Sequence, residues 1–587
     1  MKEESPIQLL DRVNMVYETN IAGEVEKVEL PFRILVLADF TRNEKSEYLG
    51  DAEPELISQN SLNGLFKALS PEIHLRVKDR LSDADDQLLL HYKFTSIDDF
   101  TPQNIINNTP AFKDITDFIT LLDNLLENQK LDLSVIEPEK RAVVAAVLQA
   151  ENISVEDIET DNSNISWLIS NLQRRISSQI DEIIHDESFK ALESAWRSLA
   201  YLVSQVDFSE NCSVSVLNVS KQAVIDDFED SPEIYRSNLY QIVYSAEYGQ
   251  LGGKPYGALI SDYYFTPKLP DIRLLQKIAG ICAMSHAPFI AAAAPEFFSI
   301  DQYSMFSKLR DLPSIFEQPA YEKWKNFRES SDARYIGLTL PSFLLRQSYD
   351  TEIGNIEYRE KIKKPENDLL WGNASFAFAS RLVDSFAKYR WCLNITGKQE
   401  GRVTGLITQN KEAKQSSSAK IATQFILTDK REAEVVTQGF IPLSVHKGDD
   451  TAAFYSAYSV HDPKVSHAQG QTEDDLSRRL GAQLPYLLII SRISQYLKIM
   501  QREHIGSWKN RRDIDHELNN WLRQYVSDMD NPAPGVRARR PLRNAVIKVR
   551  EVEGKGDWFM TKIQVTPHVK YMGATFALSE TSKLDKT

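Results

Sequence analysis

Alternating apolar and polar residues predict β-strands at the start of the chain. Residues 13–19 alternate, a glycine follows at position 23, and residues 25–30 resume the pattern. Residues 32–38 then form a more apolar strand. We therefore expect a small sheet to open the protein.

The C-terminal end carries the same kind of signal. Residues 546–552, 558–566 and 569–578 have the composition and alternation of strands. The residues expected on one face of the middle strand are Phe559, Thr561, Ile563 and Val565. Strands are therefore expected near both ends of the chain.

Between these ends, apolar residues recur at spacings of three and four, which is the period of an amphipathic helix. The expected helices cover residues 102–130, 141–150, 180–203, 273–286, 373–389, 484–501 and 513–528. Strands at residues 212–219 and 256–261 alternate with them. This alternation predicts an α/β fold, mixed with the α+β character of the chain ends.

Length and composition indicate a folded chain of several domains. The 587 residues allow about three to five domains at roughly 100 to 200 residues each. The sequence turns acidic and polar between residues 131 and 165, where we expect a domain junction.

Charge and cysteine content exclude several classes of protein. Lys and Arg number 68 against 83 Asp and Glu, a net charge of -15, so nucleic acid is not expected as a partner. The three cysteines show no disulfide or zinc spacing, which favours a reducing cytoplasm. The first residues do not resemble a signal peptide, and we find no apolar run long enough to span a membrane, so we expect neither export nor insertion.

Motifs for catalysis and cofactor binding are weak. Residues 249–254 (GQLGGK) lack the first glycine and the hydroxyl residue of a phosphate loop. Cys282 and His286 share a helix face, as a nucleophile and its base would, but their apolar surroundings favour a buried thiol. The histidines lack metal-ligand spacing. We expect no cofactor, no metal and no enzyme activity.

The N-terminal motifs resemble the small sheath subunit of the type VI secretion system, called TssB or VipA. The motifs that carry this resemblance are residues 13–19 (VNMVYET), 28–40 (VELPFRILVLADF), 69–71 (LSP) and 94–102 (FTSIDDFTP).

From residue 185 onward the chain resembles the large sheath subunit, TssC or VipB. Its motifs are residues 189–197 (FKALESAWR), 253–263 (GKPYGALISDY), 286–290 (HAPFI), 332–341 (DARYIGLTLP), 370–374 (LWGNA), 439–443 (GFIPL), 484–486 (LPY), 496–498 (YLK), 505–507 (IGS) and 538–542 (ARRPL). They follow the family order over most of the chain. The resemblance implies four parts: a small-subunit domain (1–130), the junction (131–165), a large-subunit body (166–545) and terminal strands (546–587).

The resemblance also implies a function. Family members are contractile sheath proteins that stack as hexameric rings around an inner Hcp tube on a membrane-anchored baseplate in the bacterial cytoplasm. They exchange terminal strands between subunits. The residues expected in this exchange are Val13, Met15, Tyr17, Glu18, Ile547, Lys548, Val549, Arg550, Phe559, Ile563 and Val565, with Glu18 as a candidate partner of Lys548 or Arg550. The basic residues Arg537, Arg539, Arg540 and Arg543 are candidates for contact with the tube or a neighbouring subunit.

Two features depart from the family pattern. The two subunits are usually separate polypeptides, whereas here they are joined. Large subunits of many relatives also begin with a helix that a recycling ATPase of the ClpV kind captures, and residues 141–150 are a poor substitute for it. A ClpV-type partner therefore stays open. The alternatives are a phage-tail-like injection sheath and a cytoplasmic hydrolase that uses Cys282 and His286.

Overall fold

The structure is a computed structural model of the chain. It describes residues 15–21, 24–43, 46–57, 62–81, 87–128, 162–250, 252–354, 356–410, 420–445, 451–462, 480–503, 511–529, 536, 540–551, 559–568 and 578–583. The expected helix at residues 141–150 lies outside them.

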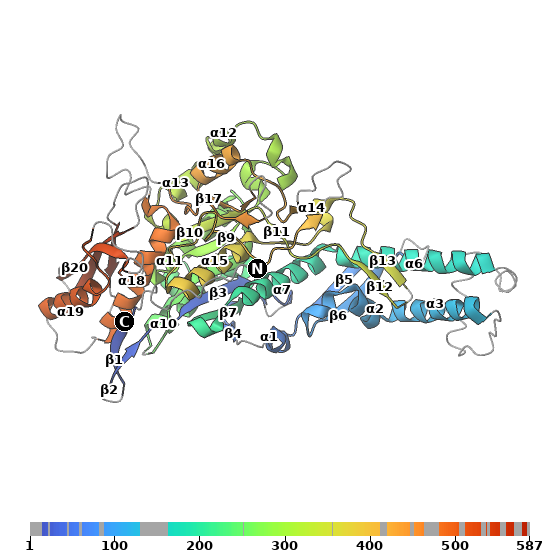
Figure 1. Cartoon of the computed structure of the whole chain (residues 1–587), viewed down its shortest axis with the longest axis horizontal. Coiled ribbons are helices and arrows are strands. Elements are labelled where there is room, and N and C mark those ends of the chain that lie inside the picture. Colours follow the sequence, from blue (N-terminus) through green and yellow to red (C-terminus); the bar gives the residue numbers. More distant parts are fainter. Residues whose placement is uncertain are drawn as a thin grey trace.

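A seven-stranded sheet lies at the centre of the molecule (Figure 1). Its strands, in spatial order, are β17 (Phe440–Pro442), β10 (Ile336–Leu340), β9 (Phe289–Ala293), β8 (Tyr256–Phe265), β3 (Phe32–Ala38), β7 (Cys212–Asn218) and β4 (Glu55–Ile57). All neighbours run parallel except β4, which is antiparallel to β7. With helices packed around this sheet, the predicted mixed α/β class is confirmed.

Strand β3 is the inner strand that joins the N-terminal part to the rest of the chain. It pairs with β7 along its whole length and with β8 on its other side. The expectation that this strand belongs to a small opening sheet is wrong. Residues 34–38 are all buried, and a continuous apolar run is typical of a parallel strand covered on both faces. Only β1 (Tyr17–Ile21) and β2 (Glu24–Val28) form a separate antiparallel hairpin.

Helix α7 (Glu187–Gln205) connects the same two parts through Trp196. The indole is fully buried and stacks on Phe66 with ring centroids 3.6 Å apart. Its Nε1 donates a hydrogen bond of 3.0 Å to the carbonyl oxygen of Phe40. Phe40 follows β3 and Phe66 lies on α1 (Leu62–Leu69). The apolar core therefore runs without interruption from the N-terminal part into the body.

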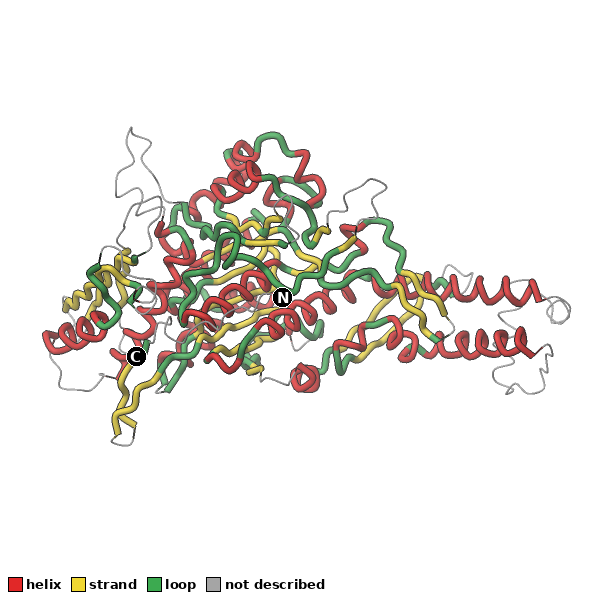
Figure 2. Tube along the Cα trace, viewed as in Figure 1, coloured by secondary structure: helices red, strands yellow, loops and turns green. Residues whose placement is uncertain are grey.

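Two long helices, α3 (Pro110–Asn128) and α6 (Asn162–Ile184), lie side by side and project from one end of the molecule (Figure 2). The helices expected over residues 102–130 and 180–203 are each divided into two helices in the structure. Thr109 separates α2 (Pro102–Asn108) from α3, and α6 ends before α7 begins. Asp186 causes the second break, because its carboxylate accepts hydrogen bonds from the amides of Ser188 and Phe189 as the N-cap of α7.

At the opposite end, a C-terminal module forms a second hydrophobic core. It contains helices α18 (Leu484–Glu503) and α19 (Arg511–Arg523) and an antiparallel sheet of β20 (Leu542–Glu551), β21 (Phe559–Pro567) and β22 (Leu578–Lys583). The expected third strand is only partly testable, because residues 569–577 lie outside the described residues and β22 begins at 578.

Candidate assembly site

Helix α18 presents different faces to the two cores. Ile489, Ile493, Tyr496 and Met500, which the helical spacing places on one side, are all buried in the core of the C-terminal module. On another side, buried polar residues recur at spacings of three as Arg492, Gln495 and Lys498. We call the contact that these three side chains make with the body the polar seam.

The polar seam consists of hydrogen bonds to backbone carbonyl groups. Gln495 Nε2 donates to the carbonyl oxygens of Tyr256 at 2.8 Å and of His286 at 3.0 Å. Lys498 Nζ donates to the carbonyl oxygen of Met284 at 2.6 Å. These carbonyl groups belong to β8 and to the end of α11 (Leu269–Ser285), so the seam holds α18 against the body.

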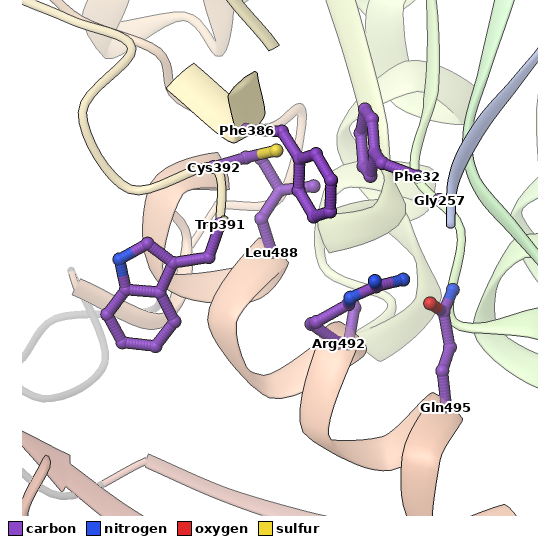
Figure 3. A pocket seen from close by; sticks show the side chains of 9 residues that line it. Phe32, Gly257, Phe386, Trp391, Cys392, Leu488, Arg492 and Gln495 are labelled. Atoms are coloured by element: carbon purple, nitrogen blue, oxygen red, sulfur yellow. The ribbon is translucent and has the colours of Figure 1, made fainter. Parts of the chain in front are cut away.

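Arg492 extends the seam to the segment before β3. Its guanidinium donates to the carbonyl oxygens of Leu30 and Pro31, the latter at 3.1 Å. Figure 3 shows Arg492 and Gln495 beside a small cavity that Phe32 and Phe386 also line. The cavity volume of about 10 Å³ is far below the roughly 300–1,000 Å³ of small-molecule sites. Its volume matches a single water molecule.

Three aromatic side chains hold the backbone that leads into the β1–β2 hairpin. Tyr496 Oη donates to the carbonyl oxygen of Met15 at 2.7 Å and accepts from the amide of Leu30 at 3.0 Å. The indole of Trp521 donates to the carbonyl oxygen of Val16 at 2.7 Å. Burial raises the pKa of Tyr496 to about 12, so its hydroxyl remains a donor at neutral pH.

Tyr525 completes this group, which we call the aromatic clamp. Its hydroxyl accepts a hydrogen bond from the amide of Val16 at 3.2 Å. Met15 and Tyr17 are buried beneath the clamp, whereas Glu18 is exposed and forms an exposed ion pair with Lys27 at 3.6 Å. The hairpin is therefore fixed at its base and extends away from the body (Figure 1).

The sheet of the C-terminal module has a buried face and a basic face. Ile547, Val549, Thr561, Ile563 and Val565 are buried, which confirms the predicted shared face for the described side chains of β21. The exposed residues of the opposite face include Lys548, Arg550 and Lys562. Lys548 and Lys562 lie directly opposite each other in the β20–β21 register.

The remaining residues predicted for strand exchange or for contact with the tube or a neighbouring subunit do not gather at one place. Val13, Arg537 and Arg539 lie outside the described residues, as does the side chain of Phe559. Arg540 is exposed and Arg543 is half-buried. Within the chain Glu18 pairs with Lys27. Its pairing with Lys548 or Arg550 concerns two copies of the chain and stays a prediction.

Cys282 and His286 do not form a reactive pair. Cys282 is completely buried, and burial raises the pKa of its thiol, so the thiolate is disfavoured. His286 ends α11 in a left-handed conformation, and its Nδ1 lies 3.3 Å from the hydroxyl of Tyr335. The hydrolase alternative is not favoured. Among the described residues no group of His, Cys, Asp or Glu is placed to hold a metal ion.

Sequence reasoning missed the clamp and the polar seam. The expected helix over residues 484–501 and the motif at residues 496–498 give Tyr496 no hydrogen-bonding partner, and the sequence gives Trp521 and Tyr525 no role. The available signal was a polar stripe, Arg492, Gln495 and Lys498, within an otherwise apolar helix. Such a stripe indicates a second surface, but it does not identify backbone carbonyl groups as the partners.

Three family models match the chain. The VipB model described as EvpB/VC_A0108, tail sheath N-terminal domain, matches residues 166–461. The model of the tail sheath gpW/gp25-like domain matches residues 473–584. The model described as Type VI secretion system, VipA, VC_A0107 or Hcp2 matches residues 9–153.

Curated relatives agree with these matches. The type VI secretion system sheath protein TssC1 of Pseudomonas aeruginosa is 35% identical over 440 residues, which cover 72% of this chain and 86% of the relative. The sheath protein TssB1 of the same organism is 28% identical over 117 residues, 20% of this chain and 67% of the relative.

Two solved structures are also similar. The anti-feeding prophage baseplate structure matches with 9% identity and a TM-score of 0.34, covering 67% of this chain and 78% of that chain. A sheath tail protein from Listeria innocua matches with 10% identity and a TM-score of 0.30, covering 60% of each chain.

The fold and the matches together define a class of protein, that of sheath subunits. The chain belongs to the type VI secretion system sheath family, as a structural subunit of the contractile sheath in which a TssB-like N-terminal part is fused to a TssC-like remainder. The predicted resemblance is confirmed, and the phage-tail-like alternative is not favoured. No helix among the described residues is long and apolar enough to cross a membrane.

Proposed function

We propose that copies of this chain polymerise into stacked six-membered rings around an Hcp-like tube on a baseplate, in the bacterial cytoplasm, and catalyse no reaction. The observation that carries the proposal is the pair of strand elements at the ends of the fold. The β1–β2 hairpin is a two-stranded ribbon, and β22 is one of the two edge strands of the described C-terminal sheet. Isolated ribbons and open edges both gain stability when another strand pairs with them.

Charge supports pairing between the hairpin of one copy and the C-terminal sheet of another. Glu18, Glu26 and Lys27 are exposed on the hairpin, where acidic residues outnumber basic ones among the described side chains, while Lys548, Arg550 and Lys562 are exposed on the sheet. Surfaces of opposite charge are drawn together when two copies meet, and surfaces of like charge are kept apart. The chain as a whole is acidic, so a basic face is a selective surface for an acidic strand.

The polar seam is the contact that changes in the contraction we propose, and its rearrangement requires no nucleotide. We infer that the C-terminal modules stay linked while the bodies re-pack against them, because a polar contact exchanges partners at a lower cost than an apolar core. The division of the chain into residues 1–130, 131–165, 166–545 and 546–587 remains part of this proposal. So does the contact of Arg537, Arg539, Arg540 and Arg543 with the tube or a neighbouring subunit, whereas recycling by a ClpV-type ATPase stays open.

Electron microscopy of two truncated chains tests the proposal. A chain that ends at Ala577 lacks β22, whereas a matched chain that ends at Lys583 retains it. The shorter chain should give folded, unlinked particles, and the longer control should form hollow tubes. Normal tubes from the chain without β22 would show that β22 is not required to link subunits.

A further inference from the structure

The two edges of the C-terminal sheet differ in the hydrogen bonding of their backbone. β21 lies between β20 and β22, so β20 and β22 are the edge strands. On the outer side of β20, the amide of Ile547 donates to Asn519 Oδ1 at 3.0 Å. In return, Asn519 Nδ2 donates to the carbonyl oxygen of Ile547 at 2.9 Å. The side-chain amide of Asn519 thus makes the pair of hydrogen bonds that a neighbouring strand would make.

Two further positions of β20, Val549 and Leu542, are bonded to the same part of the chain. The amide of Val549 donates to Asp515 Oδ1 at 3.1 Å. At the start of β20, Leu542 donates to the carbonyl oxygen of Tyr525 at 3.2 Å and accepts from the amide of Ser527 at 2.8 Å. Helix α19 and the residues after it therefore satisfy backbone groups of β20 at both ends of the strand.

We propose that Asp515 and Asn519 close the β20 edge, so that a strand of a second copy of this chain adds at β22 and not at β20. The inference rests on the proposed strand pairing and specifies which edge receives the strand. An edge whose backbone groups are already paired offers an added strand little, because each new bond replaces an existing one. The two residues are then specificity-determining residues of assembly, since an open second edge would permit branched growth.

Disulfide mapping distinguishes the two edges. Neighbouring strands lie about 4.8 Å apart, so a strand added outside β22 lies roughly 14 Å from β20. A disulfide needs Cα atoms within about 7 Å, so it forms only with the strand directly beside the added one. The native thiols of Cys212, Cys282 and Cys392 are buried, and burial raises the pKa of each, so they react slowly.

The experiment combines Glu18→Cys with one further cysteine in the full chain under oxidising conditions. Three partners lie on β22 (Ser579→Cys, Thr581→Cys, Lys583→Cys) and three lie on β20 (Val546→Cys, Lys548→Cys, Arg550→Cys). The spacing of two residues keeps each series on one face and covers shifts in register. Disulfide-linked dimers should form with the β22 series only. Asn519→Leu should add dimers with the β20 series, and the exposed neighbour Asn520→Leu should not.

Each outcome has a definite meaning. Dimers with the β20 series in chains that retain Asp515 and Asn519 would overturn the inference and leave the proposed strand pairing intact. Tubes without dimers in either series would overturn the pairing of the hairpin with this sheet, and the inference with it. Since the first mapping uses an unaltered α19, it does not depend on whether Asn519→Leu folds.

Discussion

The protein contains two internal contacts that differ in their share of polar groups. The contact between its TssB-like part and the body is apolar, with β3 between β7 and β8 and Trp196 packed on Phe66. The contact between the body and α18 is mixed. In the polar seam three side chains bond to backbone carbonyl groups, and beside it Leu484, Leu487 and Leu488 are buried in the core of the body. An apolar core is lost when its parts separate, whereas carbonyl groups can bond to water instead. The first contact suits a permanent union and the second a contact that changes.

Replacing Trp196 with alanine should have the largest effect. The substitution leaves a cavity between α7 and the N-terminal part and removes the hydrogen bond to Phe40. We expect the free energy of unfolding to fall by about 3–5 kcal/mol. Chemical denaturation followed by fluorescence measures it, with Trp167→Ala on α6, where the side chain is 54% exposed, as the control. A loss equal to that of the control would mean that the apolar contact does not hold the two parts together.

Replacing Gln495 with leucine should have an intermediate effect on stability. Leucine has a similar shape, but it cannot donate to the carbonyl oxygens of Tyr256 and His286. Because two hydrogen bonds are lost, the free energy of unfolding should fall by roughly 1–3 kcal/mol. Protease cleavage between the body and the C-terminal module should accelerate, while Gln222→Leu on the surface should change nothing. A loss as large as that of Trp196→Ala would contradict the distinction between the two contacts.

Periodic patterns predicted the elements well, but they did not predict which elements pair. The alternation of β21 is found in the expected residues, and the helix expected over residues 484–501 is present as α18. The place of β3 was missed because a strand's own residues report its burial and not its neighbours. The break at Asp186 was missed because the apolar spacing continues through it, although Asp is a strong N-cap residue.

The candidate site was predictable in outline only. Exposure of Lys548 and burial of Ile547 follow from the alternation of a strand. The aromatic clamp is different, because Tyr496 reaches Met15 across 481 positions of sequence. Periodicity contains no information about contacts at that separation, so the clamp required the three-dimensional structure.

Cutting the chain between its TssB-like part and the remainder should have the smallest effect on stability. A site-specific protease sequence inserted between Glu139 and Lys140 lies in the expected junction, outside the described residues. After cleavage, residues 1–139 and 140–587 should remain together on a sizing column, because β3 pairs on both sides with strands of the second piece. The unfolding midpoint should drop less than in either substituted chain, with the uncut insertion protein as the control. Separation of the pieces in native buffer would show that the covalent connection, and not the shared sheet, holds the subunit together.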